Sequence, residues 1–132
     1  MPPKFDPQRG ARGRGPVKLP AEGRKGAPPP WPLPGRAEPD EKKAWAELWA
    51  TPQAVAWERL GWTRTVARYC RVMVVAERPG ATAATLAQVT AMEDRLGLTP
   101  KSMRLLLWEV VSDEVGEARQ QATSVRSRIK AV

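Results

Sequence analysis

Apolar residues recur every three or four positions through the middle of the chain, the spacing of one face of an α-helix. The pattern is clearest over residues 63–78 and 82–96. Pro79 and Gly80 separate these stretches, and Thr82 is placed to cap the second one. Proline stops a helix, while glycine takes a turn without steric cost. The sequence therefore predicts a central antiparallel helical hairpin.

Similar helix breaks predict shorter helices on both sides of the hairpin. Three sites combine a proline with a residue that begins or caps a helix: Pro39 with Asp40, Thr51 with Pro52, and Thr99 with Pro100. Each combination is typical of a helix start. The predicted fold class is all-α, with short N-terminal helices, the central antiparallel helical hairpin and one further helix.

The further helix is predicted to run past Trp108 and to be apolar on two sides. One side carries Met103, Leu106, Leu107 and Val110, and Leu105 and Trp108 face nearly the other way. A helix of this kind needs two packing partners. Deep burial in one core is one interpretation, and a second subunit is the one we favour. The predicted oligomer interface comprises Met73, Leu86, Val89, Leu105 and Trp108.

The chain is expected to divide into three parts. Its first 36 residues hold ten of the 14 prolines and six of the 10 glycines. Such a segment buries too little apolar surface to offset its ordering entropy. We expect a disordered basic arm over residues 1–38, with Trp31 anchored on the folded body. A helical oligomerisation core follows over 39–111, and a flexible or partly helical basic tail over 112–132.

The apolar residues of the tail fall at alternating spacings of three and four, as in a short heptad seam. We expect a frayed helix or a segment that orders on a partner, and a candidate docking peptide. The seam consists of Val115, Ala118, Ala122, Val125, Ile129 and Val132.

Positive charge is concentrated at the two ends of the chain. Residues 1–36 carry a net charge of +6, residues 37–115 of −1, and residues 116–132 of +3. A near-neutral body with basic ends suggests nucleic acid as partner, although basic tails also aid solubility. The candidate DNA-binding residues are Arg9, Arg12, Arg14, Lys18, Arg24, Lys25, Arg64, Arg68, Arg71, Lys101 and Arg104.

The roles of the α-helical arginines and of the tryptophans each leave an alternative open. The arginines of residues 64–71 could instead pair with Glu58, Glu77 or acids of a neighbouring subunit. The five tryptophans between Trp31 and Trp62 favour aromatic packing over a base-stacking platform.

Residue types with catalytic chemistry are scarce. The chain has no histidine and a single cysteine, Cys70, so a zinc site built from Cys and His is not expected. No carboxylate pair on an apolar background and no glycine-rich phosphate loop is evident. We therefore expect no enzyme activity, no metal and no cofactor. No apolar run approaches the ~20 residues of a membrane span. We expect no membrane association and a cytoplasmic protein.

The order of the segments resembles the small terminase subunits of tailed double-stranded-DNA bacteriophages. In one large group of these, a Pro/Trp lead-in precedes the first helix and an LGLTP-type turn follows a central helical hairpin. The resemblance covers Pro16 to Val111, and its most specific part is Leu96 to Arg104. It implies a non-catalytic DNA-packaging adaptor in the host cytoplasm. That adaptor forms a ring of about eight to twelve subunits, a closed homo-oligomer. It recognises double-stranded viral DNA and presents it to the large terminase subunit, the ATPase and nuclease. The tail from Ser112 is then a candidate docking peptide for the large subunit or another part of the packaging motor.

Two other functions remain open. Residues 82–96 followed by LTPKSMRLLLW fit a helix-turn-helix DNA-binding regulator, with Lys101 and Arg104 outward. The run from Leu105 to Trp108 leaves such a helix little polar surface for reading bases. An RNA-binding accessory protein led by the RG-rich arm is the third possibility.

Overall fold

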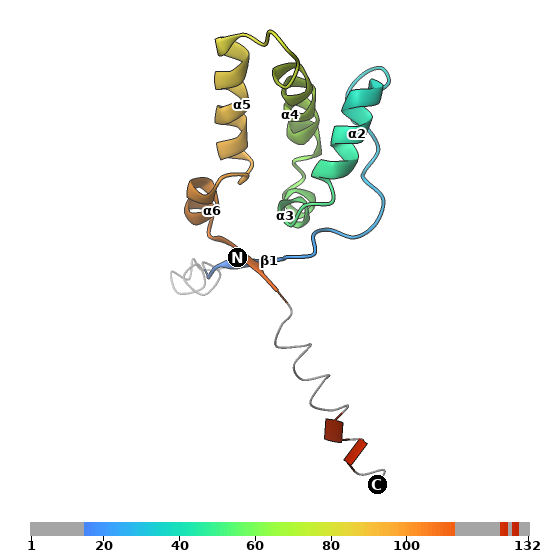
Figure 1. The fold of residues 1–132 in the computed structure, drawn as a ribbon, viewed down its shortest axis with the longest axis vertical. Helices are drawn as coiled ribbons and strands as arrows, with labels where there is room; N and C mark the ends of the chain where they lie inside the picture. Colours follow the sequence, from blue (N-terminus) through green and yellow to red (C-terminus); the bar gives the residue numbers. More distant parts are fainter. Residues whose placement is uncertain (1–14, 113–124, 127, 130–132) are drawn as a thin grey trace, which may run out of the picture.

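The computed structural model describes residues 15–112, 125–126 and 128–129. Within them the chain is mostly helical, as predicted, but it also contains a short two-stranded parallel sheet. The elements are β1 (Val17–Pro20), α2 (Pro39–Leu48), α3 (Gln53–Leu60), α4 (Thr63–Ala76), α5 (Ala83–Arg95), α6 (Pro100–Leu106) and β2 (Trp108–Val111). In Figure 1, α5, α4 and α2 stand side by side, with α3, α6 and β1 at one end of this row.

Local side-chain caps explain where two of the helices begin. The Thr82 side chain accepts a hydrogen bond from the backbone N–H of Thr85 (3.1 Å) at the start of α5. Thr99 and Ser102 form a capping box at the start of α6. The predicted helix starts at Thr82 and at Thr99 are therefore confirmed. The predicted cap at Thr51 is wrong, because its hydroxyl donates back to the Leu48 carbonyl (2.7 Å) and α3 begins one residue later.

Part of the segment predicted to be a disordered arm has a defined structure. Val17–Pro20 forms β1, which pairs in parallel with β2 so that Val17 lies opposite Trp108. Leu19 on β1 is fully buried. The prediction of disorder over residues 1–38 is therefore wrong for residues 15–38, and residues 1–14 lie outside the described part. Composition missed β1 because its hydrogen-bonding partner lies near the other end of the chain.

The helix predicted to continue through Trp108 ends at Leu106. Leu107 adopts a left-handed conformation (φ 60°), and the next four residues form β2. Trp108 is only 7% exposed and lies beside the Trp62 ring, with centroids 6.0 Å apart. Trp108 therefore belongs to the core of the single chain. Its predicted position on a second apolar helix face, with Leu105, is wrong.

Four tryptophan side chains contact one another in series within the core. Edge-to-face contacts with centroid distances of 5.2, 5.4 and 5.7 Å link, in order, Trp31, Trp45, Trp49 and Trp57. Such pairs contribute packing energy beyond the area they bury. The Trp45 indole N–H donates to the Pro29 carbonyl (2.8 Å), which ties the proline-rich segment to α2. Aromatic packing is thus confirmed for these four side chains, as is the anchoring of Trp31.

Helix α4 is the central helix, and α5 covers it from outside. Helix α4 packs on both α2 and α5, and it buries Val66, Tyr69 and Cys70. Helix α5 has no fully buried residue, although Val89 and Met92 pack partly against the core. The outer face of α5 is therefore open to solvent in the single chain.

Candidate nucleic-acid interface

The basic residues predicted to contact DNA from the arm fall into three groups. Arg9, Arg12 and Arg14 lie outside the described residues. Lys18, on β1, and Lys25, in the following loop, are exposed. The Arg24 side chain is largely buried and lies on the protein itself. Of the predicted DNA-binding residues in the described part of the arm, Lys18 and Lys25 therefore offer free positive charge to a ligand.

Arg24 holds the loop after β1 against α3. Its Nε donates to Glu58 Oε2 (2.9 Å), and its guanidinium carbon lies 5.6 Å from the centre of the Trp49 ring. The hydrogen bond with Glu58 raises the pKa of Arg24 and lowers the pKa of Glu58. A side chain with these contacts stabilises the fold and is not free for phosphate.

The three α4 arginines predicted to bind DNA do not behave alike. Arg64 and Arg68 are exposed, and neither forms an ion pair within the described residues. Arg71 instead donates from Nε to Glu41 Oε2 (2.7 Å) and lies over the Trp31 ring, 5.4 Å from its centroid. The structure therefore leaves Arg64 and Arg68 free and fixes Arg71.

Glu41 is the buried carboxylate that fixes Arg71. It is 5% exposed, and burial opposes its ionisation. Hydrogen bonds from Arg71 and from the Glu38 backbone N–H outweigh that burial, so the pKa of Glu41 is lowered. Sequence reasoning missed this pair. Glu41 lies three residues after Glu38, in the spacing of a capping box, and that spacing was the available signal.

Two further arginines lie close to this ion pair on the surface. Exposed Arg36 and Arg78 line a shallow pocket together with Arg71, Glu38 and Glu41. On the far side of the hairpin, Lys101 and Arg104 are exposed on α6. The free cations of the described part are thus spread over several faces, and no single basic patch gathers all of the predicted residues.

The sheet lies where the N-terminal basic segment and the C-terminal tail join the folded body. β1 begins three residues after Arg14, the last arginine of the segment RGARGRG, and β2 ends directly before the C-terminal tail. The two strands pair from Val17 opposite Trp108 to Pro20 opposite Val111. Paired strands lie about 4.8 Å apart. Two segments far apart in the sequence, residues 1–16 with a net charge of +3 and residues 112–132 with a net charge of +1, therefore attach to one small sheet.

Apolar side chains are exposed beside this sheet. Leu105 is 76% exposed, Leu107 48% and Val110 40%. Of the other residues predicted at an oligomer interface, Leu86 on α5 is also exposed, Met73 and Val89 are half-buried, and Trp108 is buried. We name Leu105, Leu107 and Val110 the α6–β2 apolar patch.

Candidate catalytic chemistry is sparse in the part of the chain that the structure describes. No group of three or more His, Cys, Asp or Glu side chains there is arranged to hold a metal ion. Burial raises the pKa of the Cys70 thiol to about 11 and also raises the pKa of Tyr69. Among the same residues, no helix combines the length and apolarity needed to cross a membrane.

Comparison with known proteins gives no match: no protein-family model, no curated protein and no solved structure matches the chain. No function is therefore transferred to this chain from a matching protein.

Proposed function

We propose that the protein is a non-catalytic phage DNA-packaging adaptor of the terminase small-subunit type. It forms an oligomeric ring, recognises viral DNA and presents it to the large ATPase and nuclease subunit in the host cytoplasm. The observation that carries this proposal is the parallel pairing of β1 with β2. It brings the arginine-rich segment before β1 (residues 1–16, net charge +3) and the tail after β2 (residues 112–132, net charge +1) to one sheet.

The DNA contacts of this proposal are to phosphates. Arginines in the segment RGARGRG, which ends at Gly15, lie directly before exposed Lys18 on β1. Cations close together in sequence bind a polyanion by releasing its counterions, so affinity falls steeply with salt. Arg64 and Arg68 provide a second, exposed pair on α4. Arg24 and Arg71 serve the fold instead.

The α6–β2 apolar patch supports self-association. Leu107 holds a left-handed backbone conformation, which costs a non-glycine residue about 1 kcal/mol. Its side chain is nevertheless half exposed, and the side chains of Leu105 and Val110, two residues before it and three after it in the sequence, are exposed as well. Contact with a second copy explains why an apolar side chain stands where glycine fits the backbone better. In the ring, the α4–α5 pair and this patch form the contacts between subunits.

Binding to duplex DNA, followed by fluorescence anisotropy at salt concentrations from about 50 to 200 mM, tests the proposal. Replacing Arg9, Arg12 and Arg14 together with alanine should reduce the slope of log K against log salt by about 2.7, or about 0.9 for each phosphate that is no longer neutralised. Arg59→Ala is the control, because Arg59 is exposed at the end of α3 and has no proposed role. An unchanged slope in the triple variant contradicts the proposed arm contacts.

The helix-turn-helix regulator is a second candidate, favoured by one observation. Lys101 and Arg104 are exposed on α6, directly after α5 and its turn. Helix α6, however, ends at Leu106 after only seven residues, and exposed Leu105 occupies part of its outer surface. Such regulators bind as dimers. A ring of many copies therefore separates the adaptor from the regulator.

A further inference from the structure

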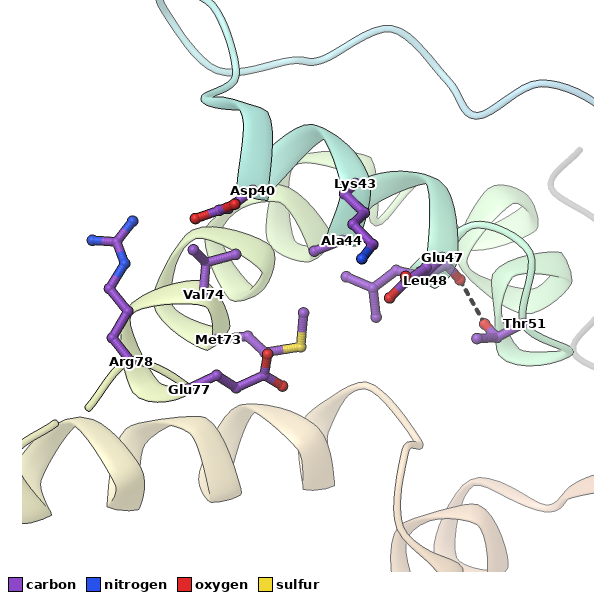
Figure 2. Close-up of a pocket in the computed structure, with 10 residues that line it drawn as sticks. All are labelled: Asp40, Lys43, Ala44, Glu47, Leu48, Thr51, Met73, Val74, Glu77 and Arg78. Atoms are coloured by element: carbon purple, nitrogen blue, oxygen red, sulfur yellow. Dashed lines mark hydrogen bonds between the residues drawn. The ribbon is translucent and has the colours of Figure 1, made fainter. Parts of the chain in front are cut away.

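A groove lies between α2 and the C-terminal half of α4, with a volume of about 430 Å³ (Figure 2). Its apolar lining consists of Ala44 and Leu48 from α2 and Met73 and Val74 from α4. Its charged lining residues are Asp40, Lys43, Glu47, Glu77 and Arg78. An apolar groove with charged edges between two helices is the form of site that receives an amphipathic helix.

The carboxylates of the groove are available to a partner. Within the described residues, the ion pairs are Arg24 with Glu58 and Arg71 with Glu41, and no groove residue takes part in them. Figure 2 shows Glu47 on α2 and Glu77 directly after the end of α4, on different walls and with Met73 between them. A helix lying over Met73 would therefore pass between two unpaired acids.

The C-terminal tail has the matching chemistry. Its heptad-spaced seam presents Val125 and Ile129 four residues apart, on one face of a helix. Both positions are helical in the structure, and their side chains are 54% and 70% exposed. Arg126 and Arg128 flank them, and no acidic residue follows Glu117. The tail thus combines an apolar stripe with uncompensated positive charge.

We propose that the α2–α4 groove receives the tail helix of a second copy of this chain. Val125 and Ile129 cover Met73 and its apolar neighbours, while the flanking arginines meet Glu47 and Glu77. This is a heterologous contact between two different surfaces, and such contacts close rings when the rotation between copies permits. The inference rests on the proposed function only in requiring more than one copy, and DNA takes no part in it.

Site-specific photo-crosslinking in the full-length protein tests this contact. Ile129 is replaced by p-benzoylphenylalanine, and the protein is mixed with an isotopically heavy copy that carries the natural residue. Mass spectrometry after irradiation should find light-to-heavy cross-links from position 129 to Met73 or its groove neighbours. The same probe at Ser127, a polar position outside the tail's apolar seam, is the matched control and should lose most of the yield.

Charge reversal on the groove gives a second readout. Glu47 and Glu77 are both exposed, so the double variant Glu47→Lys with Glu77→Lys should fold normally, which circular dichroism checks. The cross-link yield should fall about fivefold, as expected when two partly exposed ion pairs are removed. Glu22→Lys, at an exposed acid outside the groove, should leave the yield unchanged.

Three outcomes overturn the inference. The cross-links could be confined to a single copy, or they could reach α5 or α6 in place of the groove. The third is a cross-link yield that stays unchanged after the charge reversal. Intermolecular groove cross-links together with absent DNA binding would refute the DNA-packaging function and leave the tail contact standing. Strong DNA binding without the cross-links would do the reverse.

Discussion

Gly97 lies directly against the indole ring of Trp108. Its backbone is left-handed (φ 73°), and the position of a Cβ atom there is already occupied by ring atoms of Trp108. Gly97 follows the end of α5, and Trp108 begins β2. The contact therefore packs the turn of the LGLTP segment against the sheet that joins the two basic segments.

Gly97→Ala should destabilise the fold much more than Gly80→Ala. Both glycines have positive φ, 73° and 79°, so each alanine carries backbone strain of about 1 kcal/mol. Gly80 has open space around it, whereas the new methyl at Gly97 meets Trp108 and adds about 1–3 kcal/mol of overpacking. Guanidinium unfolding of both variants measures the difference. Equal destabilisation of the two variants would contradict the close approach.

Arg71→Leu should lower the free energy of unfolding by about 2–3 kcal/mol at pH 7. It leaves Glu41 buried and ionised without its partner, and removing one member of a buried pair is costly. The expected loss of stability is smaller than for a fully buried ion pair, because 44% of the Arg71 side chain is exposed to water. Arg64→Leu, at an exposed arginine on the same helix, is the control and should change stability little.

The stability difference between wild type and Arg71→Leu should depend on pH. The pKa of Glu41 is lower in the folded protein than its ordinary value of 4.5. Its stabilisation is therefore complete above pH 4.5 and is lost as the pH falls through the lowered value. Unfolding curves at pH 7 and at pH values below 4.5 should show the difference shrinking. A constant difference would mean that Arg71 acts through packing on Trp31 alone.

Leu107→Asn should weaken self-association without unfolding the protein. Asparagine tolerates the left-handed conformation that Leu107 adopts, so the fold should change in stability by less than about 1 kcal/mol. The substitution also removes the apolar side chain that we propose contacts a second copy. Sedimentation at several protein concentrations, combined with thermal unfolding, separates the two effects. Unchanged assembly would remove Leu107 from the interface.

Cys70 should be almost unreactive in the folded protein. Its thiol is fully buried and donates to the Glu41 carbonyl (3.3 Å), and burial raises its pKa to about 11. At pH 8 only about one thiol in a thousand is then ionised, and the thiolate is the reactive form. Ellman's reagent should modify the protein readily in denaturant and very slowly without it. Fast modification of the folded state would place Cys70 outside the core.

Local signals in the sequence predicted the helix boundaries that depend on neighbouring residues. Thr82 and Thr99 cap the first turns of their own helices. Such features involve residues only a few positions apart. The pairing of β1 with β2 joins opposite ends of the described body, and nothing near Val17 announces its partner.

The candidate interface was less predictable than the helices. Charge pattern alone placed Arg24 and Arg71 with the other cations, since all arginines look alike in a composition. Tertiary contacts separate them: Glu58 and Glu41, each at least 30 residues away in sequence, neutralise these two. Trp108 was placed wrongly for a similar reason. Its spacing from the preceding apolar residues fits a helix, and it gives no sign that α6 ends at Leu106 and that β2 begins at Trp108.

The solution mass of the full-length protein, measured by light scattering coupled to gel filtration, tests the adaptor proposal most directly. We expect a single species of about eight to twelve subunits, because self-association into a closed ring would cover the exposed α6–β2 apolar patch. A monomer or a dimer at the same protein concentration would contradict the ring and favour the helix-turn-helix regulator.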